Sequence, residues 1–161
     1  MALRRRRMRI RAVRNGYEIQ LPEEERQLLV HLLPQIKEVM EHPDEGRARR
    51  LFPVAYLDDV ERDAEYHRFM REELVASRTA ALEQFVATAQ QTHVDEAALM
   101  AWMQCVNGVR LVLGTVLDIS EDDEPLDLDE GDPRFPEFAL YGYLSVLLEE
   151  IVAALSGNLD R

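Results

Sequence analysis

The most distinctive chemical feature of the chain is a cluster of arginines at its amino-terminal end. Seven of the first fourteen residues are arginine and none of the fourteen is acidic, whereas the remaining residues hold 12 basic and 31 acidic side chains. A planar guanidinium donates two parallel hydrogen bonds to a phosphate or a carboxylate, so arginine suits the recognition of either anion. The cluster therefore favours an anionic partner, which can be another molecule or the protein's own acidic body.

We expect residues 1–7 to form a flexible basic arm whose tip contacts a partner. The tip residues are Arg4, Arg5, Arg6 and Arg7. Three interpretations are open: a solubilising tail, contact with nucleic acid or an acidic protein, and docking onto the acidic loop of residues 118–135. Because the formal net charge is −12, the body would repel DNA phosphates. We therefore rank an acidic protein surface first and leave direct DNA contact open.

Cys105 is the only cysteine, so the chain can form neither an intrachain disulfide nor a thiolate zinc cluster. This cysteine usage predicts a reducing, cytoplasmic location. The neighbours of Cys105 at helical spacing include Trp102, Val106 and Val109. An apolar environment raises the pKa of a thiol and makes it unreactive. We predict a buried structural residue, with a redox-sensing thiol as the alternative.

No other group of residues matches a catalytic or metal-binding motif. Asp63 and His67 are spaced i, i+4, which suits a shared metal on a helix, but no third ligand accompanies them. We interpret them as an exposed pair on a helix surface. The acidic loop does not fit the EF-hand register, the serines lack a nucleophile elbow, and no glycine-rich phosphate loop is present. The sequence therefore predicts a protein that is not an enzyme and that binds no metal or cofactor.

These residues must be positioned by a largely helical fold that begins with a short β-hairpin. Residues 8–21 alternate between apolar and polar side chains on both sides of Asn15-Gly16, a dipeptide typical of a type I′ turn. Pro22, followed by three glutamates, predicts the start of a helix. Pro34 lacks a backbone donor and should kink or break this helix.

The middle of the chain predicts a loop followed by a long helical region. Residues 51–59 form an apolar and aromatic loop that we expect to pack on the core. Asp58 or Asp59 can cap a helix that begins at the next residues and runs to about residue 91. This region can be one helix or two, with Ser77 as the weakest point.

The last third predicts two apolar helices separated by the acidic loop. Residues 92–95 have capping-box spacing and predict a helix to about residue 117, in which Gly108 and Gly114 should let another backbone approach closely. The final helix, residues 136–155, is apolar nearly all round, so it is either central in the fold or part of a homodimer interface. No uninterrupted apolar stretch reaches 18 residues, so we expect no membrane span.

Together these patterns predict a mainly α fold, a multi-helix bundle with a short N-terminal β-hairpin. We expect one helical domain over residues 1–161, in which residues 1–7 are the basic arm and residues 118–135 the acidic loop. A chain of this length can bury a core without disulfides or metals.

Residues 50–59, which we call the family loop, have the least usual sequence in the chain. The run Arg-Leu-Phe-Pro-Val-Ala-Tyr-Leu-Asp-Asp is followed by Phe-Met-Arg-Glu-Glu-Leu at residues 69–74. With these motifs, the arginine-rich start and the apolar final helix, the chain resembles an actinobacterial family catalogued as domain of unknown function 2017. The loop residues that carry the resemblance are Arg50, Leu51, Phe52, Pro53, Ala55, Tyr56, Asp58 and Asp59.

The resemblance implies a regulatory function. Members of the family resemble an oxidative-stress transcriptional regulator that acts with a sigma factor of RNA polymerase, and their genes lie near that of the ClpS proteolytic adaptor. We therefore expect a non-enzymatic, cytoplasmic, transcription-associated regulator that contacts a sigma factor. The alternative is an adaptor or scaffold in ClpS-dependent proteolysis, and the third hypothesis is a structural or oligomeric role. A thiol–disulfide switch within one chain needs two cysteines, so redox sensing at Cys105 would require an intermolecular disulfide or thiol oxidation.

Overall fold

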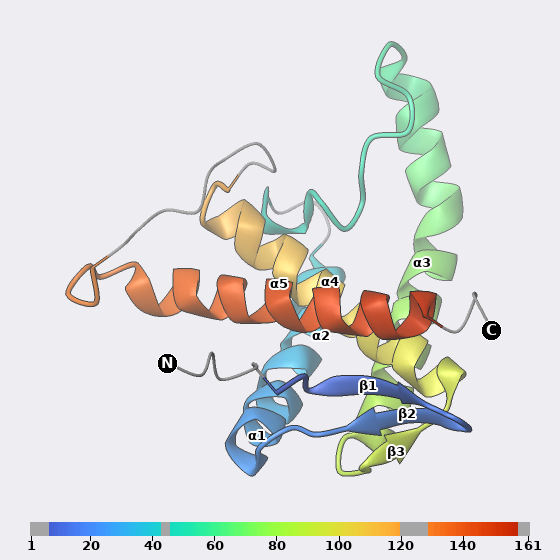
Figure 1. Cartoon of the computed structure of the whole chain (residues 1–161). Coiled ribbons are helices and arrows are strands. Elements are labelled where there is room, and N and C mark those ends of the chain that lie inside the picture. The colour runs from blue at the N-terminus through green and yellow to red at the C-terminus, as the bar shows by residue number, and fades with distance from the viewer. Residues whose placement is uncertain (1–6, 43–45, 120–128, 158–161) are drawn as a thin grey trace.

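The computed structural model describes residues 7–42, 46–119 and 129–157, and it is a helical bundle with a small antiparallel sheet near the amino terminus (Figure 1). The mainly α prediction is therefore confirmed. In chain order the elements are β1 (Ile10–Val13), β2 (Gly16–Ile19), α1 (Glu23–Leu32), the 3₁₀ helix η1 (Leu33–Gln35), α2 (Ile36–Glu41), the 3₁₀ helix η2 (Gly46–Ala48), α3 (Val60–Thr88), β3 (His93–Val94), α4 (Glu96–Val116) and α5 (Phe135–Ser156).

The predicted hairpin is present, but its turn is of a different type. β1 and β2 pair antiparallel with Ile10 opposite Ile19, and both side chains are buried as the alternation predicted. A type I′ turn needs positive φ angles at both central residues, whereas Asn15 does not have one. Gly16 does, at +132°, and a Cβ on it would lie 2.6 Å from the carbonyl oxygen of Val94. Gly16 therefore lets a third strand approach.

That third strand, β3, was not predicted from the sequence. It pairs with β2, placing Tyr17 opposite Val94, and completes a sheet of order β1-β2-β3. Its presence corrects the capping-box prediction, because residue 92 precedes a strand and not a helix. The N-cap of α4 is Asp95, whose carboxylate accepts the backbone N–H of Ala98 at 2.8 Å.

The predicted helix boundaries around the prolines and aspartates hold. Pro34 lies in η1, where the chain leaves α1 and continues into α2, so the interruption is confirmed. Asp59 is the N-cap of α3 and accepts the backbone N–H of Arg62 at 3.0 Å. From there α3 runs without a break through Ser77, which settles the question of one helix or two.

α4 is the central helix of the bundle and contacts α3, α5, β2 and both 3₁₀ helices. Trp102 packs edge-on against Phe85 of α3 with 4.9 Å between ring centroids, and its indole N–H donates to Thr88. Gly108 and Gly114 do permit close approach, but side chains and not a backbone come near. A Cβ at Gly108 would lie 2.9 Å from Cδ1 of Ile36, and one at Gly114 would lie 2.5 Å from Nη1 of Arg50.

α5 crosses α4 and reaches β1 at the surface of the bundle (Figure 1). It buries a single stripe that includes Leu144, Leu147 and Ile151, while Val152 on the other side is 43% exposed. α5 is thus not the central helix that one of our two sequence interpretations predicted. Both α4 and α5 are long and apolar enough to cross a membrane by length and composition, a test that the core helices of soluble proteins also pass.

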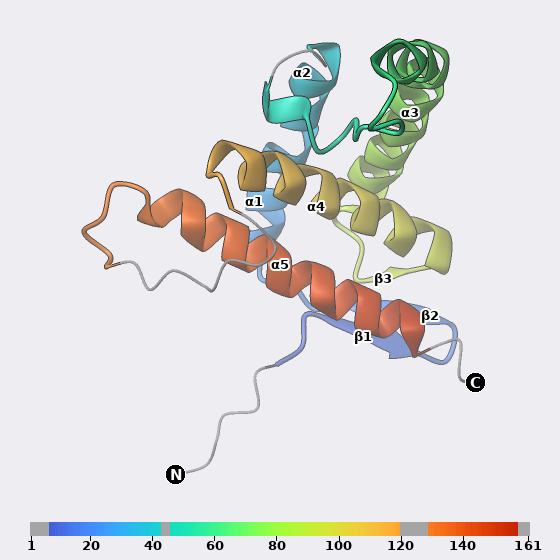
Figure 2. The same cartoon turned by 90° about the horizontal axis from the view of Figure 1, so that it is seen from above.

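The amino-terminal half of α3 projects beyond the bundle (Figures 1 and 2). The buried residues of α3 are Ala81, Leu82 and Phe85, all in its carboxyl-terminal part. We call residues 60–75 the projecting half. In it the apolar side chains of Val60 and Phe69 are 83% and 81% exposed.

Candidate functional site

The family loop is anchored at its base and runs out along the projecting half of α3 (Figure 1). The guanidinium of Arg50 donates to the carbonyl oxygen of Ile119 and lies against Gly114 of α4. Leu51 is buried, and the partly buried side chain of Phe52 packs against the core. Farther along, Val54 and Leu57 are 56% and 86% exposed. The prediction that the whole loop packs on the core is therefore wrong beyond Phe52.

Asp63 of α3 holds the middle of the family loop. Its carboxylate accepts the backbone N–H groups of Ala55 at 2.7 Å and Tyr56 at 3.1 Å, and Nε2 of His67 lies 3.4 Å away. The backbone hydrogen bond from Tyr56, then those from Ala55 and the nearby imidazole, lower the pKa of Asp63. The side chains of Asp63 and His67 are only 17% and 26% exposed. Our interpretation of an exposed surface pair is therefore wrong, because the loop covers them.

Tyr56 adds an aromatic contact between the loop and the helix. Its ring packs edge-on against Tyr66 with 6.0 Å between centroids, and the guanidinium of Arg62 stands 4.4 Å from its ring centre. Asp59 caps the helix, as described above. The remaining loop residues, Pro53 and Asp58, are exposed.

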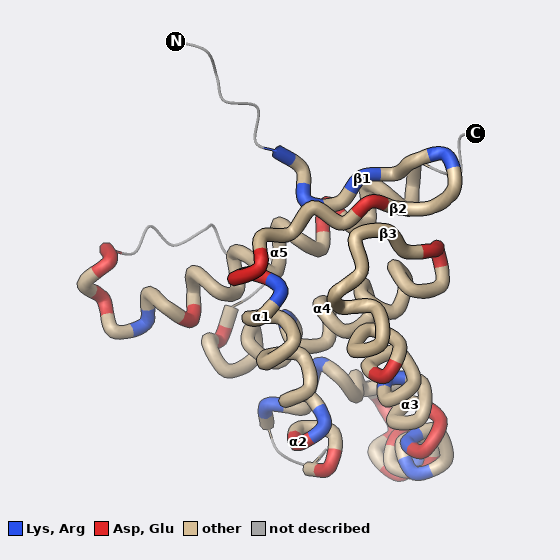
Figure 3. Tube along the Cα trace, turned by 90° about the horizontal axis from the view of Figure 1, so that it is seen from below, with Lys and Arg blue, Asp and Glu red and all other residues tan. Residues whose placement is uncertain are grey.

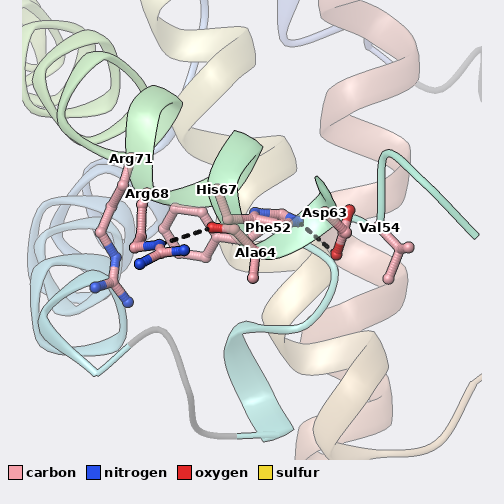
Figure 4. A pocket seen from close by; sticks show the side chains of 7 residues that line it. All are labelled: Phe52, Val54, Asp63, Ala64, His67, Arg68 and Arg71. Atoms are coloured by element: carbon pink, nitrogen blue, oxygen red, sulfur yellow. Dashed lines mark hydrogen bonds and ion pairs between the residues drawn. The ribbon is translucent and has the colours of Figure 1, made fainter. Parts of the chain in front are cut away.

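An open pocket of about 480 Å³ lies between the family loop and α3 (Figure 4). Arg68 and Arg71 lie at one end of it, while Asp63 and Val54 lie at the other. The pocket is lined by Phe52, Val54, Asp63, Ala64, His67, Arg68 and Arg71. It thus combines apolar walls with a basic end, which suits a ligand segment that carries an acidic and an apolar side chain.

Sequence reasoning found part of this site. It singled out the loop and the Asp63–His67 pair, but it missed the two arginines at the basic end. The spacing of Ala64, His67, Arg68 and Arg71 (i, i+3, i+4, i+7) places all four on one side of a helix, and this signal was available.

Arg9, which directly precedes β1, is bound by the protein's own acids. The guanidinium of Arg9 donates to both carboxylate oxygens of Glu25 at 2.6 and 2.9 Å, and its backbone N–H donates to Glu150 at 2.7 Å. Tyr143 of α5 donates its hydroxyl to the same Glu25 at 2.8 Å. Burial and the hydrogen bond to Glu25 raise the pKa of Tyr143. This network ties β1 to α1 and α5.

The tip of the basic arm lies mostly outside the described residues. This applies to Arg4, Arg5 and Arg6, whereas Arg7 donates to the side-chain oxygen of Gln20 at 3.0 Å. Most of the acidic loop, residues 120–128, is likewise outside the described part, so docking of the arm onto it stays a prediction. Among the residues that the structure describes, no group of three or more His, Cys, Asp or Glu is placed to hold a metal ion.

The family model described as domain of unknown function (DUF2017) matches residues 5–155. The chain belongs to the DUF2017 family. Similar proteins include the oxidative stress regulator AosR of Mycobacterium tuberculosis and of Mycobacterium bovis, each 28% identical over an alignment of 135 residues that covers 73% of this chain. A protein of Mycobacterium leprae that carries a provisional form of the same name is 30% identical over an alignment of 132 residues that covers 71% of this chain. The chain spans 60 to 62% of the length of these relatives, and no solved structure matches it.

Cys105 lies inside the DUF2017 match and in the core of the bundle. It is 5% exposed, and desolvation by burial raises the pKa of its thiol to about 12, although the nearby Arg78 guanidinium partly opposes this. Arg78 is itself half-buried, and burial lowers its pKa. Its Nε is buried without a hydrogen-bond partner. The predicted burial is confirmed, and a redox role for the thiol stays a prediction.

Proposed function

We propose that this DUF2017 chain is a non-enzymatic regulatory protein that acts through protein contacts in an oxidative stress response. The support comes from the relatives, which are named oxidative stress regulators and resemble this chain over about 70% of its length. Because the chain spans 60% of the first of them, their role is transferred here as a proposal. The proposed partner is a sigma factor of RNA polymerase in the cytoplasm.

The pocket beside the family loop is the observation that best supports a contact site. The loop is held at its base by Arg50 and along its length by Asp63, so the pocket exists before any partner arrives. Preformed sites bind with a smaller entropy cost. An acidic side chain of the sigma factor would pair with Arg68 and Arg71, and an apolar neighbour would cover Phe52. The basic arm would contact further acids of the same partner.

A capture experiment with the purified chain and purified sigma factors tests the pocket. We expect the double variant Arg68→Glu/Arg71→Glu to reduce capture by roughly tenfold or more, because it reverses the charge at the basic end. The matched control is Arg14→Glu/Lys37→Glu, which makes the same charge change at exposed positions away from the loop. Equal capture by both double variants would refute the pocket as the contact site.

Deletion of residues 1–7 tests the arm separately. We expect the deletion to weaken capture most at low salt, because screening reduces the contribution of exposed charges. Undiminished capture would remove the arm from the contact. If the intact chain retains ClpS or its protease and no sigma factor, the adaptor hypothesis replaces the proposed one.

A further inference from the structure

The projecting half of α3 has a second face, opposite the pocket. Arg62, Tyr66, Phe69 and Glu73 follow one another at spacings of four, three and four residues. At about 100° per residue these four positions fall within roughly 60° of one another and point away from the pocket side. All four are exposed, including Tyr66 at 38% and Phe69 at 81%. We call them the outer face of α3.

The outer face is complementary to itself when two copies of the helix run antiparallel. If the two-fold axis passes between residues 67 and 68, Tyr66 of one copy lies opposite Phe69 of the other. In the same register Arg62 of each copy lies opposite Glu73 of the other. Two aromatic pairs then occupy the centre and two pairs of opposite charge lie at the ends. Alternating spacings of three and four residues are the pattern of helices that pack along a shared seam.

The shape of the molecule fits the same register. The projecting half, residues 60–75, is centred on the point where this two-fold axis would lie, so the two free segments overlap over their whole length of about 24 Å. The body of each copy then lies beyond the tip of the other, which avoids a clash between the bodies. Acidic and basic residues both occur on α3 in its projecting half (Figure 3).

We propose that the chain forms an antiparallel homodimer through the outer face of α3. Arg62 can serve in this contact while it stacks on Tyr56, because a guanidinium keeps its in-plane donors when its face is covered. Glu65 and Glu72 flank the face, and in this register they approach each other across the interface, which weakens the dimer. The pocket lies on the opposite side of the helix and stays open in this dimer.

Sedimentation velocity over a concentration series tests the proposal. The wild-type chain should dimerise with a dissociation constant in the micromolar range, since the interface is smaller than the standard size. Phe69→Ala should raise this constant by roughly tenfold or more, because the dimer contains two copies of the residue. Glu72→Arg should lower the constant, because repulsion becomes attraction. A chain that stays monomeric up to millimolar concentration would overturn the proposal.

A charge exchange distinguishes this interface from any other. Arg62→Glu and Glu73→Arg should each weaken the dimer several-fold, and the double variant should restore it because the pairs reform with exchanged signs. Val152→Glu on α5 is the matched control and should leave the dimer unchanged. A dimer lost in Val152→Glu but kept in Phe69→Ala would show that α5 forms the interface and that the outer face of α3 does not.

Cross-linking reports the register directly. In a Cys105→Ala background, chains with Arg62→Cys should form an intermolecular disulfide with chains that carry Glu73→Cys when the two are mixed. Each variant alone should not, because its cysteines would lie about 16 Å apart along the antiparallel pair. Disulfides within either single variant, or none in the mixture, would contradict the antiparallel register.

Discussion

The two halves of α3 carry similar side chains in opposite environments. Phe85, in the carboxyl-terminal half, is fully buried against Trp102, whereas Phe69, in the projecting half, is 81% exposed. Both belong to one uninterrupted helix. The projecting half is positioned mainly by its continuity with the buried half and by its contacts with the family loop. Its exposed aromatic side chains are therefore available for binding without a loss of core stability.

The largest expected difference between the buried body and the projecting half of α3 is in the reaction rate of a cysteine thiol placed in each. Burial raises the pKa of Cys105 to about 12, which leaves roughly a thousandfold less thiolate than an ordinary cysteine near 8.5. A cysteine placed by Phe69→Cys in a Cys105→Ala background should react at the ordinary rate. Modification by a chromogenic disulfide reagent at pH 8 measures both rates. Similar rates in the two proteins would mean that the body opens readily around Cys105.

Alanine substitution should show the same contrast in stability. Phe85→Ala should lower the free energy of unfolding by about 3–5 kcal/mol, because it removes a buried ring that packs on Trp102. Phe69→Ala should change it by less than about 0.5 kcal/mol. Urea unfolding at a concentration where the chain is monomeric provides both values. A large loss in Phe69→Ala would show that the projecting half contributes to the core.

The half-buried ion pair of Arg9 and Glu25 should contribute more to folding stability than the exposed pair of Arg11 and Glu18. Glu25→Gln should cost roughly 1–3 kcal/mol of unfolding free energy, because it weakens charge-assisted bonds from Arg9 and Tyr143 in a half-buried setting. Glu18→Gln, which alters the exposed pair with Arg11, is the control and should have a much smaller effect. Equal losses in urea unfolding would remove the distinction between the two networks.

The smallest global effect is expected at Asp63, where the change should stay local. Asp63→Asn should speed hydrogen exchange at the amides of Ala55 and Tyr56 and leave global unfolding nearly unchanged. Since the folded pKa of Asp63 is lowered, its stabilising contribution is complete above the ordinary aspartate pKa and is lost as pH falls through the lowered value. Exchange of the two amides should therefore stay slow down to pH values below the ordinary range. Loosening that begins above pH 5 would contradict the role assigned to Asp63.

Local signals in the sequence predicted local structure well. The alternation around Asn15-Gly16 gave the hairpin, Pro34 the interruption, and Asp59 the helix cap, because each acts through neighbouring backbone groups. The features that were not predicted depend on contacts between residues far apart in the sequence. β3 is two residues long and has no periodicity to detect, and its pairing with β2 depends on the tertiary fold.

The candidate site shows the same division. Residues 50–59 were recognised by their composition, but the return of the family loop onto Asp63 and the pocket it forms require the three-dimensional path of the chain. Likewise the apolar pattern of α5 did not reveal that α4 is central, because periodicity identifies an apolar face and not its partner.

The continuity of α3 couples its exposed end mechanically to the core of the bundle. One helix of 29 residues, about 44 Å long, connects the exposed tip to the ring contact between Phe85 and Trp102. A molecule that binds the exposed end and displaces the helix should therefore also shift Phe85 against Trp102, the only tryptophan of the chain. The fluorescence emission of Trp102 should then report binding at the exposed end of α3 without any added label.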